Sequence, residues 1–372
     1  MNTGTLQTME KRPLDRLNPL LAQIREEARL NRDFRVDPRT MHVSTTAPIS
    51  RPEDDPDSWV HVEDAGRFAV RPRAHRHLGG FLDMPMKFYE RLRVGHPELF
   101  DPLVNGLLNK SFKARMVRTR NNAIRAILSD RYRRRDNYDL IQHILPVLEE
   151  LEGEIFPVSA SVTDAKLYLK IVYPDVQREI KKGDVVRAGF VISNSEVGEG
   201  QTEISGFVER MVCSNGMILP QWSMGRRHIG RRITGDGGDD NFEIFSDETK
   251  AADDHAFFLA IRDAVRAVGE DTNEFDKAVK RMQGSAQLEI EADPIEAVKE
   301  LAKTYDFSIR EEESILSHFL RCNDNTQWGL INAVTRAAAD VESYDRATEL
   351  EVLGGRMLDM PTRDWSRIAE TN

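Results

Sequence analysis

Apolar residues near the N-terminus recur at the spacing of one helix face, and they predict a helix over residues 13–31. The residues on that face are Leu14, Leu17, Leu20, Leu21 and Ile24. Similar spacing predicts short helices over residues 85–94 and 138–151, the second with Asn137 as its N-cap. Residues 34–70 are instead rich in Pro, Asp, Ser and Thr, which is typical of loops and edge strands that are partly mobile.

The pattern changes to that of β-strands between residues 154 and 217. A strand is predicted over residues 167–173, which are rich in β-branched and aromatic side chains. Residues 185–193 and 201–213 alternate well enough to form the two strands of a hairpin. Residues 194–200 have the turn chemistry to connect them, so the pattern favours an antiparallel sheet.

From Asp247 onward the sequence predicts a series of helices, with breaks near Gly269, Gly284, Pro294, Asn323 and Gly354. The expected fold class is therefore α+β: an antiparallel β-sheet or hairpin core with flanking helices, followed by an acidic, all-helical C-terminal region. We expect three parts. Residues 1–74 hold a helix and a partly mobile loop and edge-strand segment, residues 75–245 the α+β core with its basic segments, and residues 246–372 the acidic helices.

Charge is distributed unevenly along the 372 residues. The net charge is −10, yet residues 246–372 hold 27 acidic and 15 basic residues, whereas residues 110–135 hold ten basic residues and one acidic residue. Overall acidity argues against indiscriminate nucleic-acid binding, but local basic clusters still allow a groove that follows phosphates. No run approaches about 18 apolar residues and no secretory signal is visible, so we expect a cytoplasmic protein without a membrane partner.

Motifs that carry enzymatic chemistry are absent from the sequence. It has no P-loop, no dinucleotide fingerprint and no zinc-ligand spacing, so we expect no cofactor and no metal. His75 and His77 would share one face of a strand in a solvated basic patch. A nucleophilic Cys213 would need a nearby base such as His228, and a small core residue at a strand end is the simpler interpretation.

Pro174-Asp175 followed by Glu179-Ile180-Lys181 superficially resembles the PD…(D/E)xK nuclease signature. In that fold the two halves lie on adjacent strands, whereas here only residues 176–178 separate them. We therefore expect a turn after a strand at this place, no catalytic residues and no enzymatic activity. A metal-dependent nuclease is the least favoured hypothesis.

The arginine-rich segment over residues 113–135 is the most informative part of the chain. An extended strand over residues 118–120 would direct both of its arginines to one side, and residues 121–122 suit a turn into a second strand over residues 123–128. The planar arginine fork donates two parallel hydrogen bonds to a phosphate, and Tyr132 would stack on a base. The alternative is a surface hairpin whose arginines pair with the acidic C-terminal helices.

Under the first interpretation, these side chains and a second basic run form the two walls of a groove for single-stranded DNA, with RNA as the other candidate strand. The predicted nucleic-acid-binding residues are Arg115, Arg118, Arg120, Arg125, Arg131, Tyr132, Arg133, Arg134, Arg135, Arg226, Arg227, His228, Arg231 and Arg232.

Four strings of the sequence resemble the phage- and plasmid-borne family known as domain of unknown function 932. They are Leu-Gly-Gly-Phe-Leu-Asp-Met-Pro at 78–85, Arg-Ala-Ile-Leu-Ser-Asp-Arg-Tyr at 125–132, the stretch from Val-Ile-Ser-Asn-Ser-Glu-Val-Gly to Arg-Met-Val-Cys-Ser-Asn-Gly-Met at 191–217, and Thr-Gln-Trp-Gly-Leu-Ile-Asn-Ala-Val-Thr at 326–335. The resemblance implies a mobile-element protein in a bacterial host cell, but no mechanism. The hairpin core is also loosely similar to single-strand annealing proteins of the Rad52 and Red-beta type, at the level of fold only.

The leading hypothesis is therefore a phage-type protein that binds single-stranded DNA in recombination or replication. A groove that grips the backbone would support strand annealing without enzymatic turnover. We expect a homo-oligomer, with the acidic C-terminal helices available to a host or phage protein. The second hypothesis is a protein-interaction or inhibitor module whose acidic face mimics DNA and binds a host protein.

Overall fold

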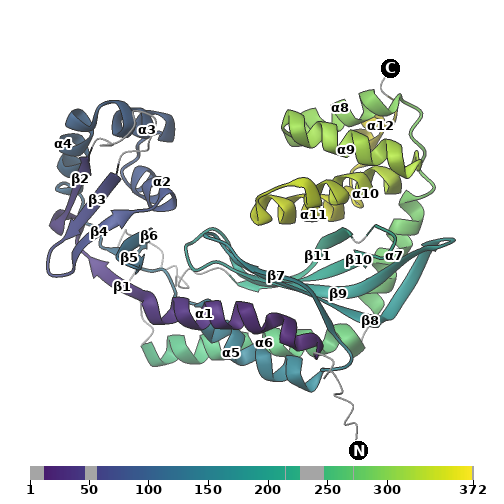
Figure 1. Cartoon of the computed structure of the whole chain (residues 1–372), viewed down its shortest axis with the longest axis horizontal. Coiled ribbons are helices and arrows are strands. Elements are labelled where there is room, and N and C mark those ends of the chain that lie inside the picture. Colours follow the sequence, from purple (N-terminus) through teal and green to yellow (C-terminus); the bar gives the residue numbers. More distant parts are fainter. Residues whose placement is uncertain (1–11, 47–56, 214, 227–246, 271, 371–372) are drawn as a thin grey trace, which may run out of the picture.

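The computed structural model describes residues 12–46, 57–213, 215–226, 247–270 and 272–370. It contains two β-sheets with helices packed on them, one six-stranded sheet in the N-terminal half and one five-stranded antiparallel sheet in the middle of the chain (Figure 1). A helical region follows, so the expected α+β class is confirmed. None of the helices within the described ranges is long and apolar enough to cross a membrane.

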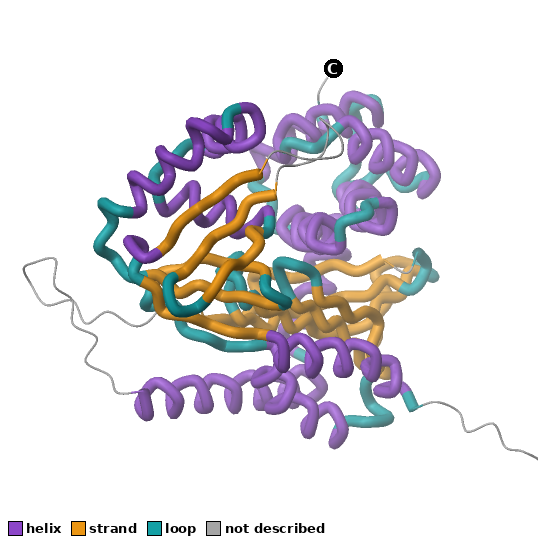
Figure 2. The backbone as a smooth tube through the Cα atoms, turned by 60° about the vertical axis from the view of Figure 1, so that its left-hand side comes forward, coloured by secondary structure: helices purple, strands orange, loops and turns teal. Residues whose placement is uncertain are grey.

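The six-stranded sheet consists of β1 (Asn31–Val36), β2 (Met41–Thr46), β3 (Asp57–Val62), β4 (Gly66–Val70), β5 (Arg115–Arg120) and β6 (Ala123–Ser129). Their spatial order is β1-β5-β6-β4-β3-β2, and every pairing except that of β4 with β6 is antiparallel. The helices α2 (Pro72–Phe81), α3 (Met86–Gly95) and α4 (Pro97–Leu108) lie along one side of this sheet (Figure 2). Their Tyr89 and Phe100 pack with Val60 and Val117 of the strands in one apolar core.

Strands rather than loops fill most of the described part of residues 34–70, because alternate side chains such as Val43 and Val60 are buried against the helices. The pairing of β4 with β6 also joins the two sides of the boundary that we expected after residue 74. Strands on both sides of that boundary therefore belong to a single sheet.

The basic ribbon predicted from the arginine-rich segment is confirmed as the β5–β6 hairpin. Asn121 and Asn122 form its two-residue turn, with φ angles of +49° and +58°. Asparagine tolerates this left-handed region better than most residues, and a turn with two positive φ angles matches the twist of a hairpin.

The five-stranded sheet consists of β7 (Phe156–Val162), β8 (Leu167–Lys181), β9 (Asp184–Asn194), β10 (Thr202–Arg210) and β11 (Asn215–Arg226), paired in chain order. The predicted hairpin over residues 185–213 is confirmed, with Ile204 opposite Ile192. The turn expected at Pro174 is wrong: irregular register between Val172 and Gln177 lets β8 continue past the proline to Lys181.

Helices cover both faces of the five-stranded sheet (Figure 1). The short η1 (Pro13–Leu17), α1 (Asn18–Leu30), α5 (Asn137–Glu150) and α6 (Asp247–Glu270) pack on one face, against side chains such as Leu169 and Ile171. Helix α7 (Asn273–Ser285) packs near the end of the same face, against Ala188 of β9, which lies on the same side of its strand as Phe190. On the opposite face, Val352 of α11 (Tyr344–Met357) packs against Val191 and Ile218. The other C-terminal helices share an apolar core with α7, and they are α8 (Pro294–Tyr305), α9 (Ile309–Cys322), α10 (Gln327–Ala337), the short η3 (Ala338–Asp340) and α12 (Thr362–Ala369). Each fully buried aliphatic or aromatic side chain contributes about 1.5–3 kcal/mol through its removal from water.

The acidic helical region therefore shares its cores with the sheet that precedes it. Helix α11 approaches β11 closely, since a Cβ added to Gly355 would lie 1.9 Å from the carbonyl oxygen of Ile218. Only glycine, which has no Cβ, leaves room for the backbone of β11 at this place.

Candidate nucleic-acid interface

The loop that connects β9 and β10, residues 194–200, leaves the five-stranded sheet and docks on β5 and β6 of the six-stranded sheet. Its Glu196 is 7% exposed, and its carboxylate accepts a hydrogen bond from Arg125 Nη1 at 2.5 Å. Its backbone carbonyl accepts one from Arg118 Nη1 at 2.7 Å. Sequence reasoning gave this loop only a turn's role, whereas the structure makes it the junction between the two sheets.

Arg118 is fully buried at this junction. Its Nε and Nη2 donate to both carboxylate oxygens of Asp33 at 3.0 and 3.1 Å, and Nη2 also donates to Asp136 at 2.6 Å. Burial alone would lower the pKa of Arg118, but the carboxylates of Asp136 and Asp33 outweigh it and raise that pKa. This guanidinium holds the protein together and is not accessible to a phosphate.

Arg120 and Arg125 converge on the same loop, which confirms that Arg118 and Arg120 point to one side of the ribbon. Arg120 pairs with Glu27 of α1 at 2.6 Å and with Glu196 at 3.4 Å. Burial would raise the pKa of Glu196, but Arg125 and Arg118 outweigh it and the pKa lies below its ordinary value. Glu196 is therefore the shared counter-ion of three arginines.

Arg133 and Arg135 point the other way, to the acidic helix α6. Arg133 pairs with Asp253 at 3.0 Å and with Asp254 at 2.8 Å, and Arg135, 1% exposed, pairs with Asp254 at 2.7 Å. The alternative interpretation predicted such pairs with the C-terminal helices, but for the arginines of the hairpin, and those pair instead with Asp33, Asp136, Glu27 and Glu196. The pairs of Arg133 and Arg135 also remove two carboxylates from any acidic face offered to a protein partner.

Tyr132 does not have the exposure that stacking on a base requires. The side chain is 9% exposed, and its hydroxyl donates to the carbonyl oxygen of Ser195 at 2.8 Å. Burial raises the pKa of this phenol above its ordinary value. Arg115 is half-buried and lies over the ring of Phe81, with 3.7 Å from its guanidinium carbon to the ring centroid. Our assignment of Tyr132 as the stacking residue is therefore corrected.

Only one residue of the second predicted wall of the groove, Arg226, lies within the described ranges. Arg226 is the last residue of β11, where its backbone pairs with Thr202. The remaining members, Arg227, His228, Arg231 and Arg232, lie outside the described residues. Cys213, whose base would have been His228, is half-buried and accepts a hydrogen bond from Arg210 Nη1 at 3.5 Å.

The other titratable residues singled out from the sequence do not form a metal site. His75 and His77 lie on helix α2, and not on a strand as we expected, and His75 is hydrogen-bonded to Tyr89 at 2.8 Å. Asp175 and Glu179 are exposed on one strand, four residues apart, which separates them by about 13 Å. Carboxylates that share one ion lie within a few ångströms of it, so this spacing contradicts a shared nuclease metal. Across the described ranges, no group of three His, Cys, Asp or Glu could hold a metal ion.

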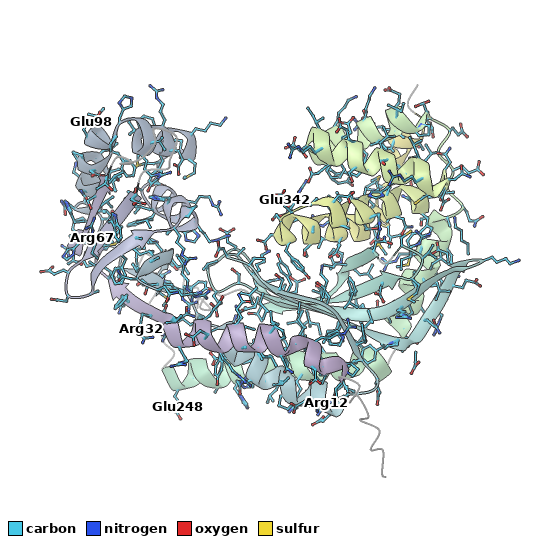
Figure 3. All side chains as sticks on the ribbon, viewed as in Figure 1. Arg12, Arg32, Arg67, Glu98, Glu248 and Glu342 are labelled. Carbon is cyan, nitrogen blue, oxygen red and sulfur yellow. The ribbon has the colours of Figure 1, made fainter. Side chains whose placement is uncertain are left out.

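Of the predicted residues, Arg134 is exposed and lies beside the outer strand β1, while the half-buried Arg131 follows Asp130, which pairs with Arg35 of that strand. Arg134 is 59% exposed and reaches Asp33 of β1 at 3.5 Å, while Arg35 of β1 is 76% exposed and reaches Asp130 at 3.5 Å. We call this strip the β1 edge. Its exposed or half-buried members are Arg32, Arg35, Arg39, Lys110, Phe112, Lys113, Arg131 and Arg134. Figure 3 shows Arg32 where α1 passes into β1.

Phe112 is the most unusual member of the β1 edge, because it is 78% exposed. It lies between Lys110 and Lys113, just before β5, and the guanidinium carbon of Arg39 lies 5.3 Å from its ring centroid. The strip holds seven cations against the three carboxylates Asp33, Asp37 and Asp130. Sequence reasoning missed Phe112, although an aromatic residue between two lysines in a loop was a visible signal.

Comparisons of the chain with models of protein families, with curated proteins and with solved structures found no match. The resemblance to domain of unknown function 932 therefore stays a prediction.

Proposed function

We propose that this protein binds single-stranded nucleic acid along the β1 edge, without enzymatic turnover. The observation that carries the proposal is the exposure of Phe112, an aromatic ring 78% exposed that lies between Lys110 and Lys113 in the sequence and beside Arg39. Exposed rings are costly to hydrate, and a ring surrounded by Lys and Arg is suited to stack on an unpaired base while the cations contact phosphates. A duplex offers no free base face, so a single strand is the expected ligand.

The β1 edge contains only two residues of the groove that was predicted from the sequence. Arg118, Arg125 and Arg135 are buried in ion pairs, so their replacement would test folding more than binding. Arg131 and Arg134 are kept from the predicted set and are joined by the cations of β1 and of residues 110–113.

The test is the fluorescence anisotropy of a labelled 30-mer, as DNA and as RNA and as single strand and duplex, titrated with protein at several salt concentrations. If about five phosphates are neutralised, log affinity should fall with log salt at a slope near −3.5 for a single strand. Replacing Arg35 or Lys113 by Gln should reduce that slope by about 0.7 each and weaken binding to all sequences alike.

Phe112→Ala should weaken single-strand binding by about 5- to 150-fold, since stacking on one base is worth about 1–3 kcal/mol. Its matched control is Phe88→Ala, which removes a ring that is 47% exposed on α3 and lies away from the β1 edge. No binding at low salt, or equal losses in the two variants, would refute the proposal. Binding that holds would make strand annealing the next activity to measure.

A further inference from the structure

A second basic site lies at the other end of the arginine ribbon, in a pocket between the two sheets. The pocket has a volume of about 20 Å³, and its cationic lining residues are Arg71, Arg120, Arg125 and Lys166. Arg71 precedes α2, Arg120 and Arg125 belong to the ribbon, and Lys166 lies in the turn before β8. The four come from both sides of the junction, so the site exists only when the two sheets are docked.

Arg125 has donors that the protein does not satisfy. Its side chain is 8% exposed, and Nη1 is engaged by Glu196. Nε and Nη2 are both buried, and neither has a hydrogen-bond partner. Buried guanidinium N–H groups are rarely left without an acceptor, because they give up water without a replacement. We therefore expect a ligand that enters the pocket to supply the hydrogen-bond acceptor for these two groups.

Cations outnumber carboxylates around this pocket. Its four cations face Glu196 and the exposed Asp164, and Arg71 reaches Asp164 at 3.4 Å. Burial, together with the neighbouring charges of Arg125 and Arg71, lowers the pKa of Arg120, although Glu27 and Glu196 oppose this. Mutual repulsion among the cations shows that an anion placed between them would be stabilised.

We propose that this pocket binds an anionic oxygen of a phosphate group. A volume of about 20 Å³ admits a single water-sized atom, so one oxygen would enter toward Arg125 while the rest of the group stays at the mouth. Arg71, 39% exposed, and the flexible Lys166 are placed to contact the outer oxygens. The site shares no residue with the β1 edge, so the two proposals can fail separately.

Isothermal titration of the full-length protein with inorganic phosphate tests this inference, with sodium chloride at matched ionic strength and pH as the reference. Binding of phosphate and not of chloride is expected. Lys166→Gln and Arg71→Gln should each weaken phosphate binding at least tenfold while leaving the melting temperature nearly unchanged, because both side chains are partly exposed. The matched control is Arg76→Gln on α2, which removes a nearby charge that is 54% exposed and does not line the pocket.

Two results would overturn the inference. Equal heats for phosphate and chloride would mean that the pocket holds only water. A loss in Arg76→Gln as large as that in Arg71→Gln would mean that phosphate senses the general basic field and has no defined site. The source of the phosphate is read separately, from displacement of the labelled 30-mer by inorganic phosphate. If inorganic phosphate displaces the 30-mer from the wild type but not from Lys166→Gln, the pocket binds a backbone phosphate of the strand. If phosphate does not displace the 30-mer from the wild type, the pocket binds a free phosphate or a small phosphorylated compound.

Discussion

Glu196 is the residue whose replacement should most disturb the junction between the two sheets. In Glu196→Gln the side chain keeps its shape, and the new carbonyl oxygen can still accept the hydrogen bond from the backbone N–H of Asn137, which is 2.7 Å long in the wild type. The charge that compensates Arg125 and Arg120 is lost, and Arg125 is only 8% exposed. Removing one member of a buried ion pair costs about 3–5 kcal/mol, so we expect a loss of that size.

The assay is equilibrium unfolding in urea, followed by circular dichroism, with the free energy of unfolding compared between variants. Glu199→Gln is the matched control, since it lies on the same loop, is 34% exposed and pairs with Arg73 at 2.8 Å. A partly exposed pair of this kind contributes at most about 1 kcal/mol. If the free energies of unfolding of Glu196→Gln and Glu199→Gln differ by less than about 1 kcal/mol, then Glu196 does not stabilise the contact between the sheets and the reasoning is wrong.

The difference in stability between the wild type and Glu196→Gln should depend on pH in the direction that the pKa shift of Glu196 sets. The pKa of Glu196 is lowered in the folded protein, where Arg125 and Arg118 outweigh the effect of burial. The stabilisation is therefore complete above the unfolded value of about 4.3 and is lost as pH falls through the lower folded value. The stability gap between wild type and Glu196→Gln should narrow below about pH 4 and stay constant from about pH 6 to 8. A gap that widens in acid would contradict the assignment.

Three further predictions use the same unfolding assay. Arg118→Met should cost about 3–5 kcal/mol because it removes the buried cation that Asp33 and Asp136 share, whereas Arg134→Met, 59% exposed, should stay within about 0.5 kcal/mol; similar losses would contradict the burial of Arg118. Asn121→Ala should cost about 1–2 kcal/mol because its φ is +49°, and no loss would mean a different turn. Gly355→Ala should cost at least about 1–3 kcal/mol, whereas Gly106→Ala on α4, with nothing within 4 Å, should be neutral or stabilising.

Elements whose pattern is local could be predicted from the sequence. Residues 121–122 and 194–200 both connect strands, because turn residues between alternating segments specify a hairpin without information from the rest of the chain. The helix expected over residues 13–31 is present as η1 and α1. The six-stranded sheet was missed as a sheet, since β1 pairs with β5 and β4 with β6 across long stretches of chain.

The site was harder to predict than the fold because arginine serves two purposes. The ten basic residues over 110–135 look alike in the sequence, yet Arg118 is fully buried while Arg134 is 59% exposed. What separates them is the position of distant carboxylates such as Asp33 and Asp254, and these positions depend on tertiary contacts. Charge density was therefore compatible both with a phosphate-binding groove and with internal ion pairs, and it could not say which arginines face solvent.

The strings on which the resemblance to domain of unknown function 932 rests are mostly buried. Leu78 is fully buried in α2, Glu196 is the counter-ion at the junction, and Trp328 donates to the buried Asp184 at 2.8 Å. Side chains in such places determine how elements pack, whereas a ligand contacts what is exposed. Apart from Asp130 and Arg131, the β1 edge lies outside all four strings. A protein that shared the strings would be expected to share the junction and the fold, and its ligand would still have to be established from its own equivalent of Phe112.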